Sequence, residues 1–279
     1  MAATQPKIAA VIVCHNAAED LSRCLAALEA GSLPPALTCI VDSGSDDTGY
    51  LAALSERPQT ICIREANIGY GPGNNLGLAE VPPDIPVVLF LNPDCFVLPY
   101  TLERAATLFE ADPDLAALGP RLLGFDREHN APTGLLDSTG IVRAWYGRWR
   151  DRGQGEPDDG RYNAPETVPA LCGACLFCRR SALEAVSPAP DQAFDPAFFL
   201  YKEDIELCLR LRLRKRGFRL LYHPAVRAHH CRGWQGRAAM SRELKLIAAA
   251  NEIRLYLRHP SPYMLWALLK YALVRCLGV

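Results

Sequence analysis

The sequence has almost no net charge, and this absence limits the partners that the protein can attract by electrostatics alone. Its 279 residues include 30 Lys or Arg and 31 Asp or Glu, which gives a formal net charge of −1. Proteins that hold nucleic acid through a general positive field carry a basic excess. The whole-chain balance therefore argues against a nucleic-acid partner.

The chain also lacks a basic, apolar N-terminal leader, an internal repeat and a long uninterrupted apolar run. Without a leader, secretion is not expected, and the predicted location is the cytoplasm. The apolar segment 262–279 is broken by Lys270 and Arg275, so it is too short and too charged for a membrane span. Two interpretations stay open for this tail: it lies at a membrane interface, on the inner face of the cell membrane, or it packs on the rest of the protein.

Eleven cysteines are present, but no second pair stands at metal-binding spacing. Cys172, Cys175 and Cys178 have a spacing found in zinc sites, and His230 or Cys231 could supply a fourth ligand only through folding. Four other cysteines lie inside apolar runs: Cys14, Cys39, Cys62 and Cys208. We interpret the cysteines as reduced core residues and the segment around residue 175 as a buried strand.

The first 100 residues alternate between two kinds of segment. Apolar runs that end in polar residues occupy 7–16, 36–47, 60–71 and 87–94. Between the first two runs, Leu21, Cys24, Leu25 and Leu28 have helical spacing. Strands that alternate with helices predict an α/β fold, in which a mostly parallel sheet is flanked by helices. In such sheets ligands bind beyond the carboxyl ends of the strands, where the polar residues stand.

The second half of the sequence is less regular. Residues 101–118 predict a helix followed by a strand, whereas 124–168 are rich in Gly, Asp, Arg and aromatic residues and predict a long, irregular, partly ordered insertion. Within residues 198–218, Leu or Cys alternates almost strictly from Leu207 to Arg214, but the composition favours a helix that begins near Glu203. Two more helical stretches, separated by Pro260 and Pro262, end the chain.

Taken in order, these motifs resemble one family. The chain is similar to an inverting nucleotide-sugar glycosyltransferase of family 2 with the GT-A fold, over about residues 7–235. Within the family it looks nearest to bacterial rhamnosyltransferase-like members that build cell-surface polysaccharides. The resemblance implies a catalytic domain over 1–235, a C-terminal helical extension over 236–279, and a glycan or lipid-linked acceptor.

The segment LNPDCF, residues 91–96, resembles the Asp-x-Asp motif of the family. It implies that Asp94 binds Mg²⁺ or Mn²⁺, which offsets the charge of the donor diphosphate. Asn92 stands where the family has its first Asp, so only one carboxylate is assured. The segment YHPAVRAHH makes His230 a candidate metal or diphosphate contact, although a structural role is equally open.

Donor and acceptor contacts follow from the same resemblance. It implies substrate binding by His15, Asn16, Asp42, Ser45, Asn67, Gly69, Asn75, Asn92 and Gly173. Asp42 is expected at the base or ribose of the nucleotide, and the glycines near residue 69 allow the backbone to approach a ligand closely.

The segment FFLYKEDIELCLR resembles the Glu-Asp motif of the family, which places the catalytic base at Asp204. A neighbouring carboxylate at Glu203 raises the pKa of such a base by charge repulsion. The competing interpretation is that Asp204 only caps a helix. Residues 207–242 contain ten Lys or Arg and no acid, which indicates either a solvated helix face or neutralisation of diphosphates and membrane lipid.

Two other functions compete with sugar transfer. A sugar-1-phosphate nucleotidylyltransferase needs a Gly-rich N-terminal loop with Arg and Lys, and residues 11–24 lack one. A non-catalytic sugar- or zinc-binding module has no need of Asp204.

Overall fold

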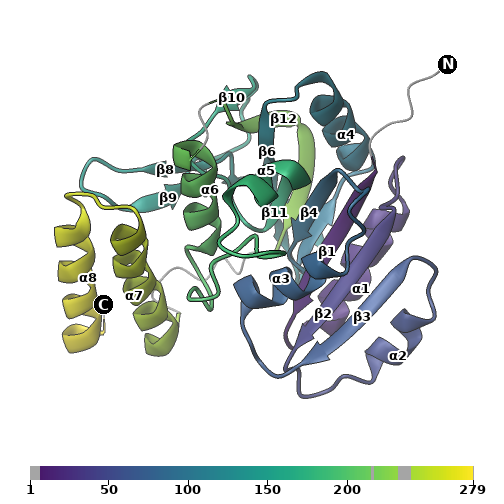
Figure 1. Cartoon of the computed structure of the whole chain (residues 1–279), viewed down its shortest axis with the longest axis horizontal. Helices are drawn as coiled ribbons and strands as arrows, with labels where there is room; N and C mark the ends of the chain where they lie inside the picture. Colours follow the sequence, from purple (N-terminus) through teal and green to yellow (C-terminus); the bar gives the residue numbers. More distant parts are fainter. Residues whose placement is uncertain (1–6, 215–216, 232–239, 279) are drawn as a thin grey trace.

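The computed structural model of the chain describes residues 7–214, 217–231 and 240–278. A ten-stranded sheet lies at its centre, with helices packed against it, and a pair of helices projects at one end (Figure 1). The strand order along the sheet is β10-β12-β6-β11-β4-β1-β2-β3, with β5 and β7 paired to β12 and β6. The predicted α/β architecture is confirmed.

The strands are β1 Ile8–Cys14, β2 Leu37–Ser43, β3 Thr60–Glu65, β4 Val87–Leu91, β5 Cys95–Val97, β6 Leu115–Asp126, β7 Ala131–Ser138, β8 Ile141–Arg143, β9 Trp149–Asp151, β10 Glu166–Thr167, β11 Cys175–Arg179 and β12 Arg219–His230. The helices are α1 Ala18–Glu29, α2 Tyr50–Ser55, α3 Tyr70–Ala79, α4 Thr101–Ala111, α5 Arg180–Val186, α6 Glu203–Arg214, α7 Arg242–Arg258 and α8 Met264–Leu277.

The parallel half of the sheet consists of β3, β2, β1 and β4. Every residue of β1 and β4 is buried, as expected for strands covered on both faces. Helix α1 buries the four residues whose spacing predicted it: Leu21, Cys24, Leu25 and Leu28. The register pairs Cys14 with Asp42 and Ile12 with Leu91, so the carboxyl ends of these strands meet at one edge of the sheet.

The prediction that residues 124–168 form an irregular insertion was wrong in part. Strand β6 continues to Asp126, β7 pairs with it antiparallel, and β8 pairs with β9 as a separate hairpin. Strands β8 and β9 have three residues each, and β7 alternates half-buried and exposed residues over its first half. Such a weakly buried pattern carries little of the apolar signal by which a strand is found in a sequence.

The zinc-like spacing of the cysteines reflects a buried strand. Cys175 pairs with Leu91 and Cys178 with Val88 in the antiparallel β11–β4 ladder. A separation of three residues places their side chains on opposite faces of the sheet. Within 7–214, 217–231 and 240–278, no three His, Cys, Asp or Glu side chains are grouped so that they could hold a metal ion.

Helices α7 and α8 confirm the two helical stretches predicted for the C-terminus. Helix α7 is bound to the rest of the molecule, because the Tyr256 hydroxyl donates to the Gly147 carbonyl at 2.8 Å and Arg258 pairs with Asp195 at 2.9 Å. The predicted domain boundary between residues 235 and 236 lies outside the described residues. Among the helices in the described ranges, none is both long and apolar enough to cross a bilayer.

Candidate active site at the carboxyl edge of the sheet

The turn that carries Asp94 is held between two strands. Strand β4 ends at Leu91, and the Asn92 amide then donates to the Ala174 carbonyl at 2.9 Å. On the other side, the Cys231 amide donates to the Asp94 carbonyl, also at 2.9 Å. These bonds fix the Asn-Pro-Asp turn at the edge where the parallel strands end, as the sequence predicted for a ligand-binding residue.

The Asp94 carboxylate lies between two cationic side chains. Its Oδ1 is 3.4 Å from His230 Nε2, and its Oδ2 is 3.9 Å from an Arg127 guanidinium nitrogen. Burial alone raises the pKa of Asp94, but the charges of His230 and Arg127 outweigh it, and the pKa lies below its usual value. Asp94 is therefore ionised at neutral pH and retains 22% side-chain exposure.

His230 is oriented by a residue that sequence reasoning missed. Its Nδ1 lies 2.8 Å from Asp137 Oδ2, and both side chains are buried. Burial lowers the pKa of His230, but Asp94 and Asp137 raise it to about 10. Asp137 fixes the ring so that Nε2 faces Asp94, an arrangement also found around metal-ligating histidines.

The second carboxylate, Asp204, stands in the first turn of α6. Its Oδ2 accepts from the Gly173 amide at 3.0 Å and its Oδ1 from the Ile205 amide at 2.8 Å. A Cβ atom at Gly173 would lie 3.2 Å from that of Asp204, so glycine permits this close approach. Two N–H donors stabilise the ionised carboxylate, and its side chain remains partly exposed.

Glu203, by contrast, is buried, and its Oε2 has no hydrogen-bond partner. Burial, followed by the charge of Asp204, raises the pKa of Glu203 to about 8. Burial also raises the pKa of Asp204 above its usual value, although the Gly173 amide opposes this change. At neutral pH Glu203 therefore holds a proton in the folded protein, and Asp204 is the member of the pair whose carboxylate oxygens accept from two N–H groups.

One short segment connects the two carboxylates. Ala174 accepts the hydrogen bond from Asn92, and its neighbour Gly173 donates to Asp204. The Tyr70 hydroxyl donates to the Gly173 carbonyl at 2.8 Å and so fixes this segment from the side of α3. The structure thus brings Asn92, Gly173 and Asp204 together, although more than 100 residues separate the first from the last.

The backbone that leads into Asp204 is held in an unusual conformation. Tyr201 and Lys202 both have positive φ angles, +70° and +74°, which cost free energy in residues other than glycine. The Asn251 side chain of α7 donates to the carbonyls of Leu200 and Tyr201 at 2.8 and 3.0 Å. Helix α7, which the sequence did not connect with the site, therefore holds the segment that presents Asp204.

A cavity of about 150 Å³ opens beside Asp204, between the β8–β9 hairpin and the start of α6. Its lining includes Trp149, Asp151, Lys202, Glu203 and Asp204. It combines an aromatic ring with groups of both charges, which suits a hydroxylated ring compound.

The loops after β1 and β2 bring four more predicted residues together. His15 Nδ1 lies 2.9 Å from the Ser43 carbonyl, and the Asn16 amide donates to Ser45 Oγ at 2.8 Å. Asp42 is fully buried, and it accepts from the Ser45 amide at 2.9 Å and from the Tyr50 hydroxyl. The structure thus uses the Asp42 carboxylate to shape the loop, and its direct contact with a nucleotide stays a prediction.

The third loop is closed by Gly69. Its amide donates to Ser43 Oγ at 3.2 Å, its φ is +88°, and an added Cβ would collide with Phe199. Asn67 is exposed on the same loop, where Gly44 packs against its backbone. Asn75 lies apart from this group. Its side-chain amide donates to the Phe194 carbonyl at 2.8 Å and accepts from the Phe194 amide at 2.9 Å.

Part of the basic run has internal partners. Arg210 is buried and bonded to Glu206 of the same helix at 2.8 Å and to the Val186 carbonyl at 3.0 Å. Residues 215–216 and 232–239 of the run lie outside the described residues.

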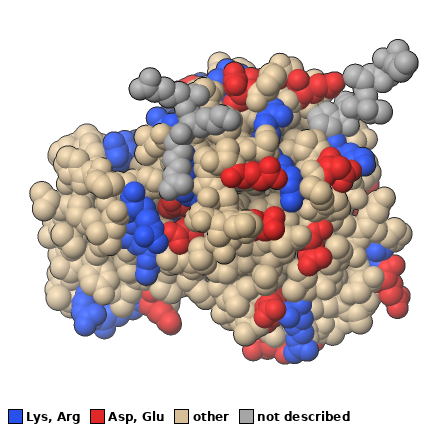
Figure 2. Space-filling model, viewed as in Figure 1, with Lys and Arg blue, Asp and Glu red and all other residues tan. Residues whose placement is uncertain are grey.

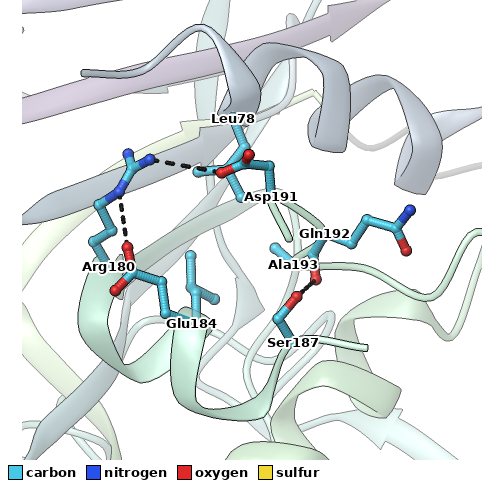
Figure 3. Close-up of a pocket in the computed structure, with 8 residues that line it drawn as sticks. Leu78, Arg180, Glu184, Ser187, Asp191, Gln192 and Ala193 are labelled. Atoms are coloured by element: carbon cyan, nitrogen blue, oxygen red, sulfur yellow. Dashed lines mark hydrogen bonds and ion pairs between the residues drawn. The ribbon is translucent and has the colours of Figure 1, made fainter. Parts of the chain in front are cut away.

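A different small hollow, of about 20 Å³, lies against α5 (Figure 3). Arg180 reaches Glu184 at 3.2 Å and Asp191 at 3.9 Å there, and Ser187 donates to the Gln192 carbonyl. Arg179 pairs with Val87 at the start of β4, so this hollow is at the opposite end of that strand from Asp94. It belongs to the packing of α5 and not to the carboxylate site.

The model of one protein family, described as glycosyl transferase family 2, matches residues 9–187. The chain belongs to this family. The match covers the strand ends with Asp42 and Asp94 and continues through β11 and α5, whereas Asp204 and His230 lie beyond it. A comparison with curated protein sequences finds none that matches.

Solved structures similar to the family 2 chain include GalNAc-T7 with UDP, GalNAc and Mn²⁺, at 15% identity and a TM-score of 0.69, covering 99% of this chain and 57% of the other. Another is the mannosyltransferase PcManGT from Pyrobaculum calidifontis with GDP-Man and Mn²⁺, at 15% identity and a TM-score of 0.63, covering 99% and 72%. A third is S. aureus TarS 1-349, at 14% identity and a TM-score of 0.56, covering 96% and 80%. At such identities the likeness shows the fold, and the GT-A type prediction is confirmed.

Proposed function

We propose that this protein is an inverting glycosyltransferase that moves a sugar from a nucleotide-diphosphate donor to a hydroxyl group of a glycan or lipid-linked acceptor. The observation that carries the proposal is the pair of carboxyl side chains, Asp94 and Asp204, whose segments are joined through residues 173–174 at the edge of the sheet. Family membership supports it. Similar structures contain UDP, GDP-Man or UDP-GlcNAc, which supports a nucleotide-sugar donor.

In this proposal Asp204 acts as the general base. It accepts the proton of the acceptor hydroxyl while that oxygen bonds to the anomeric carbon of the donor sugar. The bond from this carbon to the diphosphate breaks on the opposite face, and the nucleoside diphosphate leaves, which inverts the configuration. The N–H groups of Gly173 and Ile205 aim the carboxylate, and the cavity beside it accommodates the acceptor.

The residues around Asp94 fit a divalent metal ion. Asp94 offers a partly exposed, ionised carboxylate, and His230 offers its Nε2 atom, which would give up its proton to bind the ion, on a ring whose orientation Asp137 fixes. These two side chains would hold Mg²⁺ or Mn²⁺ if diphosphate oxygens and water completed its coordination. Such an ion would neutralise the charge of the leaving diphosphate. Mn²⁺ in two of the similar structures supports this assignment.

The loops after β1, β2 and β3 are proposed to form the nucleotide pocket. His15, Asn16, Asn67 and Gly69 present polar and backbone groups there, and Asp42 with Ser45 shapes the loop. We propose rhamnose as the first donor sugar to test and bacterial cell-surface polysaccharide as the product, on the resemblance of the motifs.

Replacement of Asp204 by Asn tests this function. The transfer rate with an active nucleotide sugar should fall by about 10² to 10⁴-fold, because the base is removed, while donor affinity stays close to that of the wild type. Asp191→Asn is the control, since this aspartate lies in the separate hollow against α5. Full turnover by Asp204→Asn would refute the assignment. An earlier melting transition with normal turnover per folded molecule would leave Asp204 as a helix cap only.

A further inference from the structure

The outward face of α8 is apolar, and no described residue covers it. Six of the exposed positions are apolar and follow a spacing of three and four residues along the helix: Leu265, Leu268, Leu269, Ala272, Leu273 and Cys276. Leu265 is 76% exposed and Leu269 is 54% exposed. This spacing forms a single stripe along the helix, which we call the α8 stripe. Amphipathic helices of soluble proteins normally turn such a stripe toward the core.

The orientation of the stripe is fixed by the opposite face of α8. Ala267 and Val274 are buried on the side that packs against α7. Between them, the Lys270 ammonium pairs with Glu252 of α7, and both side chains are buried. Rotation of α8 to hide the leucines would break this pair and bury unmatched charges, which is strongly unfavourable. The stripe is therefore presented to the exterior by the fold.

A second segment adds aromatic surface next to the stripe. The turn between β8 and β9 approaches the start of α8 (Figure 1), where the Tyr146 ring lies 5.1 Å from the Trp266 ring. Trp145 stacks edge-on with Tyr146 and is 87% exposed. Exposed tryptophan beside leucines is typical of surfaces that enter the boundary between lipid headgroups and acyl chains.

The same part of the molecule is cationic, although the whole chain is nearly neutral. Residues 141–151 and 240–278 together contain nine Lys or Arg and three Asp or Glu. Since Lys270 and Glu252 neutralise each other inside the hairpin, Arg242, Lys245, Arg275 and their basic neighbours outnumber the remaining acids at its surface. In Figure 2 the flank formed by α7 and α8 is largely tan, with patches of Lys and Arg around it. An apolar stripe with a basic border complements anionic lipid.

We infer that the α8 stripe and Trp145 dock the protein on the surface of an anionic lipid bilayer. With 14 residues, α8 would lie in the plane of the headgroups, with its leucines below and its basic residues at headgroup level. This inference does not depend on the proposed sugar transfer, because it concerns a surface separate from the carboxylate site. The competing occupant is a second copy of the chain.

The test is co-sedimentation of the full chain with vesicles of phosphatidylcholine mixed with phosphatidylglycerol, compared with phosphatidylcholine alone. Leu265→Gln combined with Leu269→Gln should reduce partitioning to the anionic vesicles by about tenfold or more, since two exposed leucines lose their apolar contact. Trp145→Ser should reduce it by a smaller factor. Leu213→Gln is the matched control, because Leu213 is 66% exposed at the end of α6 and should partition like the wild type.

Circular dichroism of each variant confirms that the helices are retained, and light scattering measures the oligomeric state. Docking is supported if the Leu265→Gln/Leu269→Gln variant loses vesicle binding while the Leu213→Gln control retains it. Weaker binding of the wild type to neutral vesicles than to anionic vesicles also supports docking. Equal partitioning of wild type and double variant, or no partitioning of either, overturns it. A wild-type dimer that the double variant converts to a monomer, without vesicle binding, also overturns it and assigns the stripe to a second copy.

Discussion

The proton on Glu203 can be tested through the pH dependence of stability. The folded protein raises the pKa of Glu203 from its ordinary 4.5 to about 8, because the carboxyl group is buried beside Asp204. Between these values the folded chain holds a proton that the unfolded chain releases. Folding is thus favoured by this group below about pH 4.5, and the benefit is lost as the pH rises through about 8. Glu203→Gln, which cannot ionise, removes this dependence.

The size of the effect follows from linkage. Each pH unit within the window changes the free energy of unfolding by about 1.4 kcal/mol, so about 3 to 4 kcal/mol is lost between about pH 5 and about pH 8. For a chain of 279 residues, about 1 kcal/mol corresponds to about 2 °C in melting temperature. The difference in melting temperature between Glu203→Gln and wild type should therefore grow by about 6 °C across this range, in favour of the variant.

Calorimetry of both proteins at a series of pH values measures this difference in melting temperature. The contributions of all other titrating groups cancel, because both proteins contain them. Glu110→Gln serves as the control, because Glu110 is exposed and its replacement should give a difference that does not change with pH. A flat difference for Glu203→Gln would refute the proton assignment. It would mean that Glu203 is ionised at neutral pH in the folded protein.

Two further changes test the metal contact and the loop after β3. The Asp94→Asn variant should fold normally but bind the donor at least about tenfold more weakly than the wild type when Mn²⁺ is present. Without Mn²⁺, the two proteins should bind the donor about equally. If isothermal calorimetry shows equal donor affinities in the presence of Mn²⁺, Asp94 is not a metal ligand. Gly69→Ala should cost roughly 1–3 kcal/mol of stability, because alanine adds a collision with Phe199 to an unfavourable φ. Gly134→Ala is the control, because Gly134 has a similar φ of +75° but no atom lies within 4 Å of the added Cβ. Denaturant unfolding should therefore show a smaller loss of stability for this variant. Equal losses of stability in the two variants would contradict the collision with Phe199.

Much of the fold could be predicted from local patterns. The continuous apolar run of β4 and the helical spacing of Leu21, Cys24 and Leu28 survive into the structure because burial on one or both faces dictates them. Strands β7 to β10 could not be predicted, because β8 to β10 have only two or three residues each and β7 is half exposed, so pairing with another strand stabilises them more than their own composition does.

The candidate site divides in the same way. Asp94 and Asp204 could be named as candidates from the sequence because each stands at the end or start of a regular element, in a motif that a sequence displays directly. Asp137 and Asn251 were missed, since each is a single polar residue whose role depends on the residue that it meets, His230 in one case and the Tyr201 carbonyl in the other. Such partners are chosen by packing between segments far apart in the chain.

The sequence by itself determined where the strands of the parallel half end and which polar residues follow them, because hydrophobic periodicity and turn chemistry are local properties. Only the tertiary structure decided which of these residues meet. The antiparallel insertion of β11 beside β4 places Gly173 between Asn92 and Asp204, and burial raises the pKa of Glu203 beside it. The same holds for α8, whose leucines face outward because the buried Lys270–Glu252 pair fixes the helix on α7.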